Sequence, residues 1–256
     1  MTAASGNATH QRIGLQLYSV RELAERDLIS VLQRVAAIGY TGVEFAGLHD
    51  TPPSEIRDAL DSLGLEAIGA HVGLEDLEGG LDATIEDIEA LGCRAAIVAW
   101  LPPESYGDAA KAHRTVDRLL RAGEAVRAAG LEFAYHNHHF EFAPIEDGPS
   151  LWSMLTAVPL EALPLELDIY WVRHAGVDPT ALLADLGPRV TLIHAKDTAA
   201  DGSGDAPVGV GVENWPEILE LTRRAGVEWL VIEQERSSDI YADIARSLEN
   251  LGRLLP

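Results

Sequence analysis

A unit made of an amphipathic helix, a glycine-containing turn and a short apolar run repeats along the chain. Helical segments with apolar residues at three- and four-residue spacing include 28–39, 115–130 and 239–252. Eight alternating strands and helices in about 250 residues predict a closed (β/α)8 barrel rather than an open doubly wound sheet, since no GxGxxG follows the first strand. The expected strands are 13–19, 42–47, 66–72, 95–100, 132–138, 164–171, 190–197 and 229–235.

The chain length suits one such domain. With 256 residues, 47% of them hydrophobic, we expect residues 1–10 to form a disordered N-terminal tail and residues 11–256 a single TIM-barrel catalytic domain. No apolar run approaches the ~20 residues of a membrane span, and the first residues lack the pattern of a secretory signal. We therefore expect a cytoplasmic protein that does not bind membranes.

The charge of the chain argues against nucleic acid as a partner. The formal net charge is −22, from 41 acidic and 19 basic residues, so the surface would repel phosphates. A single cysteine, Cys93, leaves neither a disulfide framework nor a cysteine-based zinc site. The sequence leaves open whether the chain forms a homo-oligomer.

Polar side chains gather where the expected strands end. In a barrel these ends converge on one face, where such enzymes carry their active sites. Residues two apart on a strand point to the same side, which several of these pairs satisfy. The residues are Gln16, Tyr18, Glu44, His71, Trp100, His136, His138, Asp168, Tyr170, His194, Lys196, Glu233 and Glu235.

Asp168, His194 and Glu233 follow three consecutive strands, the sixth, seventh and eighth. One imidazole and two carboxylates suit a divalent ion such as Mn²⁺, Mg²⁺, Co²⁺ or Zn²⁺. Any one of these three residues, taken alone, would more often cap a loop or pair with a core side chain than bind a metal. The stretch "YHNHHFEF", residues 135–142, ends the fifth strand and would supply a fourth ligand.

Seven motifs together resemble the sugar phosphate isomerase/epimerase superfamily of xylose-isomerase-like TIM barrels. They are "IGLQLYSVR", "GYTGVEF", "GAHVGLE", "YHNHHFEF", "LDIYW", "HAKD" and "VIEQE", and the resemblance covers residues 13–255. It implies one divalent metal ion held by a glutamate, an aspartate, a histidine and a second glutamate from successive strands. Asp168, His194 and Glu233 would take the last three roles, with Mn²⁺ the metal we expect.

The first ligand is open. Many relatives have Glu-Asn-His where this chain has His136-Asn137-His138. Glu141, five residues on, is a candidate substitute carboxylate, followed by His136 and then His138. The family's epimerases use both metal-bound glutamates as acid and base, so a histidine here would remove that symmetry.

The expected metal ligands and the resemblance together predict a metal-dependent sugar isomerase or epimerase that works through a metal-stabilised enediolate. We expect Glu233 to be the base and Lys196 to neutralise the oxyanion, with His136 and Glu141 as further acid/base candidates. The less favoured alternative for Lys196 is a surface salt bridge, and the other residues could simply pack or cap the barrel. The expected substrate-binding residues are Tyr18, Glu44, His71, Trp100, His138, Tyr170 and Trp171.

Residues 198–215 are rich in glycine and small polar residues, and we expect a mobile loop over the site. Because no basic cluster marks the strand ends, a neutral ketose, keto-inositol or 3-keto-glycoside is favoured over a sugar phosphate. Three rival functions remain: a zinc-dependent DNA-repair endonuclease, which the charge disfavours; a lyase or hydrolase of keto-glycosides on the same site; and a non-catalytic sugar-binding barrel.

Overall fold

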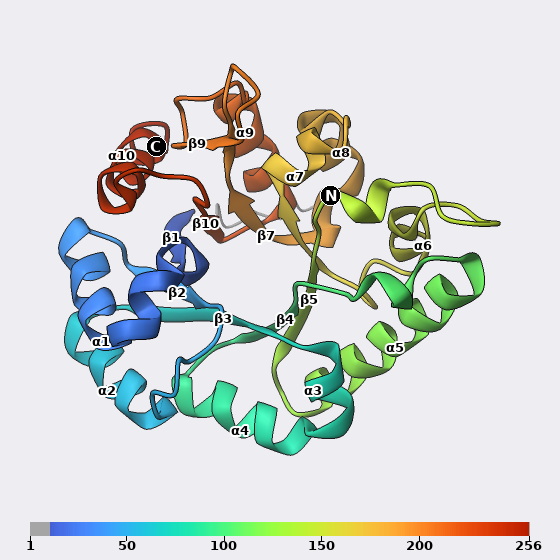
Figure 1. Ribbon diagram of the computed structural model, residues 1–256, viewed down its shortest axis with the longest axis horizontal. Helices are drawn as coiled ribbons and strands as arrows, with labels where there is room; N and C mark the ends of the chain where they lie inside the picture. The colour runs from blue at the N-terminus through green and yellow to red at the C-terminus, as the bar shows by residue number, and fades with distance from the viewer. Residues whose placement is uncertain (1–10, 256) are drawn as a thin grey trace, which may run out of the picture.

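The computed structural model describes residues 11–255, and the predicted tail lies outside this range. Eight parallel strands close into a barrel in the order β1-β10-β7-β6-β5-β4-β3-β2, which confirms the predicted (β/α)8 fold (Figure 1). Two short strands, β8 and β9, pair outside it. The bounds are β1 Arg12–Gln16, β2 Gly42–Phe45, β3 Glu66–Val72, β4 Ala95–Val98, β5 Glu132–His136, β6 Leu165–Asp168, β7 Val190–Ala195, β8 Asp197–Thr198, β9 Asp205–Ala206 and β10 Trp229–Ile232.

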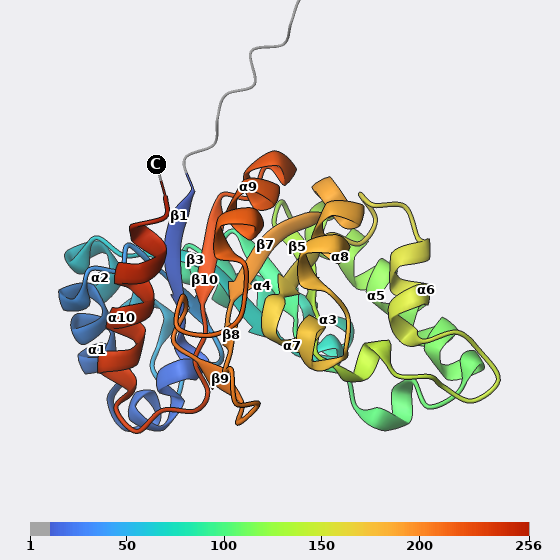
Figure 2. The same cartoon turned by 90° about the horizontal axis from the view of Figure 1, so that it is seen from above.

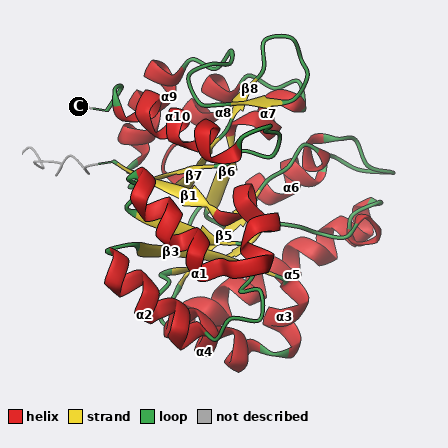
Figure 3. Ribbon diagram, turned by 60° about the vertical axis from the view of Figure 1, so that its left-hand side comes forward, coloured by secondary structure: helices red, strands yellow, loops and turns green. Residues whose placement is uncertain are grey.

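Helices surround the barrel and bury their apolar stripes against it (Figures 1 and 3). Helices α1, α2, α4 and α9 end at glycines with left-handed backbone, as the turn motifs predict. The bounds are α1 Arg21–Ile38, α2 Pro53–Leu63, α3 Leu74–Gly79, α4 Leu81–Leu91, α5 Ala109–Ala128, α6 Leu151–Ala157, α7 Ile169–His174, α8 Pro179–Leu186, α9 Trp215–Ala225 and α10 Ile240–Gly252.

Most strands are shorter than the apolar runs that predict them, and the sixth shows why. We expected a strand over 164–171, but β6 ends at Asp168 and α7 begins at Ile169. The Asp168 carboxylate accepts a hydrogen bond from the Trp171 amide at 2.8 Å and so caps the first turn of α7. Tyr170 and Trp171 consequently lie on a helix and not on a strand end.

The barrel interior is apolar at one end and polar at the other. Its apolar layer consists of Ile68, Ala95, Ile97, Ala134, Leu192, Trp229 and Val231. Two residues further along their strands, and so on the same face, come His136, His194 and Glu233. In Figure 2 the chain enters β1 from above, and β8, β9 and α7 lie at the opposite end of the barrel. The polar layer therefore lies toward the carboxyl ends of the strands.

The segment after β7 is anchored by one buried carboxylate. Asp197 accepts hydrogen bonds from the amides of Gly209 and Glu213 and from the Trp215 indole, at 2.8, 3.1 and 2.8 Å. These contacts hold the end of the 198–215 loop, and its mobility stays a prediction.

Within residues 11–255, no helix is long and apolar enough to cross a membrane.

Gly42→Ala should destabilise the barrel, because a methyl group at Gly42 would lie 2.6 Å from the Trp229 ring. Overpacking of this kind costs about 1–3 kcal/mol in the free energy of unfolding, measurable by urea denaturation. Gly79→Ala is the matched control, since its added methyl group meets nothing within 4 Å. Equal stability of the two variants would contradict the proposed packing of Trp229.

Candidate active site

A cavity of about 350 Å³ opens at the carboxyl ends of the strands. A larger cavity, about 700 Å³, lies beside it along α3 and α4 and shares His71. Only the smaller one reaches the predicted metal ligands. It is lined by Tyr18, His71, Ala99, Trp100, His136, His138, Trp171, Glu233 and Glu235, so most of the predicted substrate-binding residues face it.

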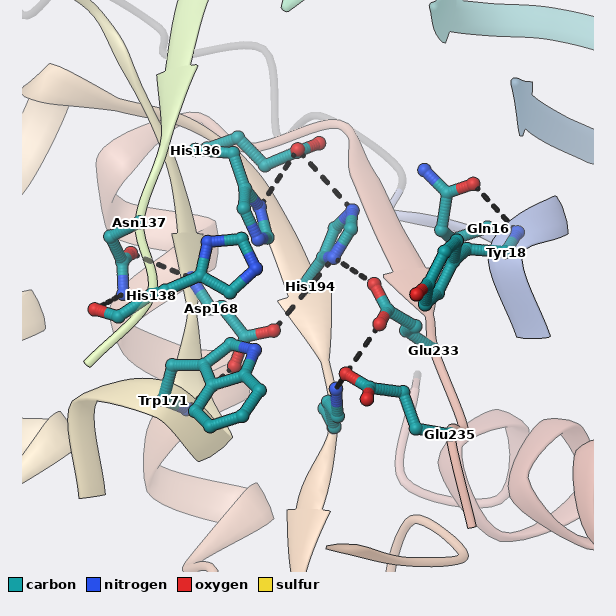
Figure 4. Close-up of polar contacts among 12 residues, drawn as sticks. Gln16, Tyr18, His136, Asn137, His138, Asp168, Trp171, His194, Glu233 and Glu235 are labelled. Atoms are coloured by element: carbon teal, nitrogen blue, oxygen red, sulfur yellow. Dashed lines mark hydrogen bonds and ion pairs between the residues drawn. The ribbon is translucent and has the colours of Figure 1, made fainter. Parts of the chain in front are cut away.

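Asp168, His194 and Glu233, here called the outer set, converge beside this cavity (Figure 4). His194 Nδ1 lies 2.8 Å from Glu233 Oε2 and 3.8 Å from Asp168 Oδ2. Asp168 Oδ2 is buried without a hydrogen-bond partner among the described residues, and the buried His194 Nδ1 has the Glu233 carboxylate beside it. A buried polar atom without a partner is costly, and a divalent ion would satisfy Asp168 Oδ2 while it binds His194 Nδ1 and Glu233. The outer set therefore fits the divalent metal that the sequence predicts.

Two backbone contacts fix Asp168 at this position. Its amide donates to the Asn137 side-chain oxygen at 3.0 Å, which links β6 to the end of β5. One carboxylate oxygen caps α7, so only the other faces the outer set. Burial raises the pKa of Asp168, against the lowering effect of Lys196 nearby.

Lys196 is fully buried and belongs to the site, not to the surface. Its ammonium lies 3.1 Å from Glu233 Oε1 and also contacts Glu235. It sits 5.0 Å from the centre of the Trp171 ring, within reach of a cation–π interaction. Although burial opposes the charged form, Glu233 holds the pKa of Lys196 well above its ordinary value. Lys196 thus places a fixed positive charge beside the outer set.

The charges around Glu233 favour its ionised form. Burial raises its pKa, but Lys196 and His194 outweigh burial and hold that pKa well below the usual range. An ionised carboxylate that lines the cavity can accept a proton from a bound molecule.

A second group lies next to the outer set in the barrel interior and is here called the inner set. It consists of Glu44, His71, His136, Glu166 and the Nε2 atom of His194. Although burial opposes the charged form, Glu44 and Glu166 raise the pKa of His71 to about 9. Burial lowers the pKa of His136 to about 4, helped by the neighbouring His194. Glu44 is completely buried and does not line the cavity, so its predicted contact with substrate is not made here.

Glu141 lies outside both groups, contrary to its predicted role as first ligand. One carboxylate oxygen accepts a hydrogen bond from the Tyr135 hydroxyl at 2.7 Å, and the other accepts one from the His138 amide at 2.9 Å. The carboxylate is buried and does not line the cavity. Through these contacts Glu141 stabilises the turn that follows β5. His136 is then the β5 side chain that lies nearest the outer set.

Tyr170 is also placed differently from the prediction. It is buried on α7, stacked against His174 and in edge contact with Trp171, and it does not line the cavity. Because α7 begins at Ile169, Tyr170 lies on a helix and its side chain does not line the cavity. Trp171, the next residue, does reach the cavity.

Glu166 is the site residue that sequence reasoning missed. It is completely buried, and its Oε2 lies near His71, His136 and His194. The sequence carries a signal for this residue. Glu166 lies two residues before Asp168, so both side chains must share one face of β6. An acidic residue at a barrel-interior position is unusual enough to mark the site.

Known proteins resemble this chain at low identity. The inosose dehydratase of Geobacillus kaustophilus (strain HTA426) is 23% identical over 221 residues, covering 78% of this chain and 66% of that protein. A sugar phosphate isomerase/epimerase from Parabacteroides distasonis ATCC 8503 superposes with a TM-score of 0.83 at 21% identity, covering 99% of this chain and 98% of that chain. The probable 3-DHS dehydratase involved in petrobactin synthesis in Bacillus anthracis has a TM-score of 0.72 at 14% identity, with 94% and 99% covered.

A family model described as xylose isomerase-like TIM barrel matches residues 32–251, most of the barrel and all of both residue sets. With the closed eight-stranded barrel and the polar face just described, this chain belongs to the xylose isomerase-like TIM barrel family.

Proposed function

We propose that this chain is a divalent-metal-dependent isomerase or epimerase of an uncharged keto sugar or keto-inositol. The observation that carries the proposal is the outer set, in which Asp168 Oδ2, buried and without a hydrogen-bond partner among the described residues, converges with His194 Nδ1 and Glu233 beside a cavity. Members of the family and structural relatives include sugar isomerases and epimerases, which supports the same reaction class.

Asp168, His194 and Glu233 would hold the ion, with His136 completing the set from β5. When bound, a divalent ion polarises a substrate carbonyl and stabilises the negative charge of an enediolate. Glu233 would take a proton from the carbon next to that carbonyl, which its position in the lining of the cavity supports. Return of the proton to the opposite face gives an epimer, and its return to the neighbouring carbon gives an isomer.

Lys196 would assist this proton transfer electrostatically. Its ammonium is held by Glu233 and Glu235 and would favour negative charge developing on a bound oxygen. Tyr18 and Trp100 form an aromatic rim at the cavity, with 41% and 59% of their surface exposed. Exposed aromatic faces of this kind suit the apolar face of a sugar ring.

The cavity favours an uncharged substrate. None of the described residues that line it is lysine or arginine, and two of them are glutamates. A phosphate group would therefore meet two carboxylates and no basic side chain in the lining of the cavity. Among the substrates considered, a keto-inositol is supported by the similarity to an inosose dehydratase.

That same similarity favours a second candidate function, a dehydratase. Loss of a hydroxyl from the carbon beyond the one that loses its proton would use the same base and ion, and both an inosose dehydratase and a probable 3-DHS dehydratase resemble this chain. Product analysis separates the two, because an isomerase conserves the mass of its substrate and a dehydratase lowers it by one water.

Asp168→Ala should bind one divalent ion fewer per chain than the wild type, because it removes a ligand that has no other buried partner on that oxygen. Elemental analysis after loading with Mn²⁺ measures this, and circular dichroism checks that the barrel remains folded. An unchanged metal content in a folded Asp168→Ala protein would place the ion elsewhere.

His136→Ala should weaken binding of Mn²⁺ more than Glu141→Ala, since Glu141 is already engaged by Tyr135 and His138. Calorimetric titration of the two metal-free variants compares the affinities, and loss of a ligand typically costs at least about tenfold. A larger loss in Glu141→Ala would restore Glu141 as the first ligand.

Glu233→Gln should lower turnover at least about a hundredfold in metal-loaded protein, because an amide does not accept the proton and a positioned base contributes about 10²–10⁴-fold. Deuterium uptake from solvent into a panel of ketoses and inososes measures the step directly. Glu235→Gln is the control, a carboxylate two residues on that contacts Lys196 but not His194. If the Glu233→Gln protein exchanges the substrate hydrogen at nearly the wild-type rate, the base is a residue at the end of β5 and not Glu233.

A further inference from the structure

We propose that the inner set binds a second divalent cation in the barrel interior. The inner set lies next to the outer set and comes from five different strands, β2, β3, β5, β6 and β7. The proposal goes beyond the function above, which places an ion at the outer set alone.

The distances between the ligand atoms have the pattern of a coordination shell. Glu166 Oε2 lies 3.0 Å from His71 Nε2, 3.1 Å from His136 Nδ1 and 3.3 Å from His194 Nε2. Bonds of about 2.1 Å from a transition-metal ion to imidazole and carboxylate place neighbouring ligand atoms about 3.0 Å apart. The spacing of these atoms is therefore what a central ion would produce.

Hydrogen bonds alone do not account for the arrangement. His71 Nε2 lies 3.0 Å from both Glu44 Oε2 and Glu166 Oε2, and His194 Nε2 also faces both carboxylates, at 2.8 and 3.3 Å. A ring nitrogen carries at most one hydrogen, so it donates well to only one of them. A cation bound by His71, His136, Glu166 and His194, whose ligand atoms lie within 4.8 Å of one another, removes this conflict, with Glu44 beside His71 and His194 as an additional negative charge.

The neighbouring amide adds to this conflict. The Gln16 side-chain nitrogen donates to Glu44 at 2.6 Å and lies 3.3 Å from His71 Nε2. Its orientation is set by the Tyr18 amide, which donates to the Gln16 oxygen at 3.0 Å. A protonated His71 Nε2 would therefore face a second donor, whereas a metal-bound Nε2 would not need that hydrogen.

Burial supplies the second, independent observation. Glu44 and Glu166 are completely buried, and the Oε1 atom of each has no hydrogen-bond partner among the described residues. No lysine or arginine forms an ion pair with either carboxylate within residues 11–255. Buried carboxylates require a cation or several donors, and a divalent ion provides the charge directly.

The ligand chemistry indicates the kind of ion. Three imidazole nitrogens with one carboxylate oxygen, from His71, His136, His194 and Glu166, suit Zn²⁺, Co²⁺ or Mn²⁺ better than Ca²⁺ or Mg²⁺, which prefer all-oxygen shells. His194 lies between the two sets, with Nδ1 toward the outer one and Nε2 toward the inner one. The two proposed ions would thus share the His194 imidazole, and His136, proposed above as the fourth ligand of the outer ion, would face the inner ion through Nδ1.

The test compares two neighbouring carboxylates on β6. Metal-free protein is reloaded with Zn²⁺, and in parallel with Mn²⁺, and the bound ions per chain are counted by elemental analysis and calorimetric titration. The wild type should bind two ions, Glu166→Gln should keep one, and the matched control Asp168→Asn should also keep one. Reloading with Co²⁺ should give an absorption band that changes in Glu166→Gln.

The possible outcomes separate the two sites. One ion in the wild type that is lost in Asp168→Asn and kept in Glu166→Gln overturns the inner site, and Glu166 then only orients the imidazoles. One ion that is lost in Glu166→Gln and kept in Asp168→Asn supports the inner site and contradicts the outer one. If Glu166→Gln fails to fold, His71→Ala replaces it, because the His71 side chain is 16% exposed and tolerates truncation better. Retention of every ion by a folded His71→Ala protein, with unchanged affinity, overturns the proposal.

Discussion

The interior of this barrel has to compensate negative charge that the fold buries. Glu44, Glu166 and Asp168 are completely inaccessible to solvent, and the imidazoles of three histidines lie among them. A charge removed from water is tolerated only when it is paired or coordinated. The position of His194 between two carboxylate groups, the cap on α7 and the burial of Lys196 all follow from this requirement.

The fold was predictable because each local signal agreed with the barrel. Eight apolar runs separated by amphipathic helices predict the closed barrel, and glycines mark the helix ends, as the structure shows at Gly39 and Gly92. The strand limits were less predictable. An apolar run such as residues 164–171 looks the same whether it continues as a strand or turns into a helix, and the capping contact of Asp168 decides.

The candidate site was predictable in part, and the reasons differ by residue. Asp168, His194 and Glu233 follow consecutive strands, so their meeting follows from the topology alone. Glu141 was misjudged because its short distance along the sequence does not show that Tyr135 and the His138 amide already bind it. Glu166 was overlooked because attention to strand ends passed over the layer beneath them.

The central claim is that a divalent ion lies among Asp168, His194 and Glu233. A crystal of Mn²⁺-loaded protein, measured at a wavelength where manganese scatters anomalously, tests this claim most directly. The account predicts an anomalous peak within bonding distance of Asp168 Oδ2, His194 Nδ1 and Glu233 Oε2. A well-ordered crystal with these three side chains in place and no peak among them would contradict it.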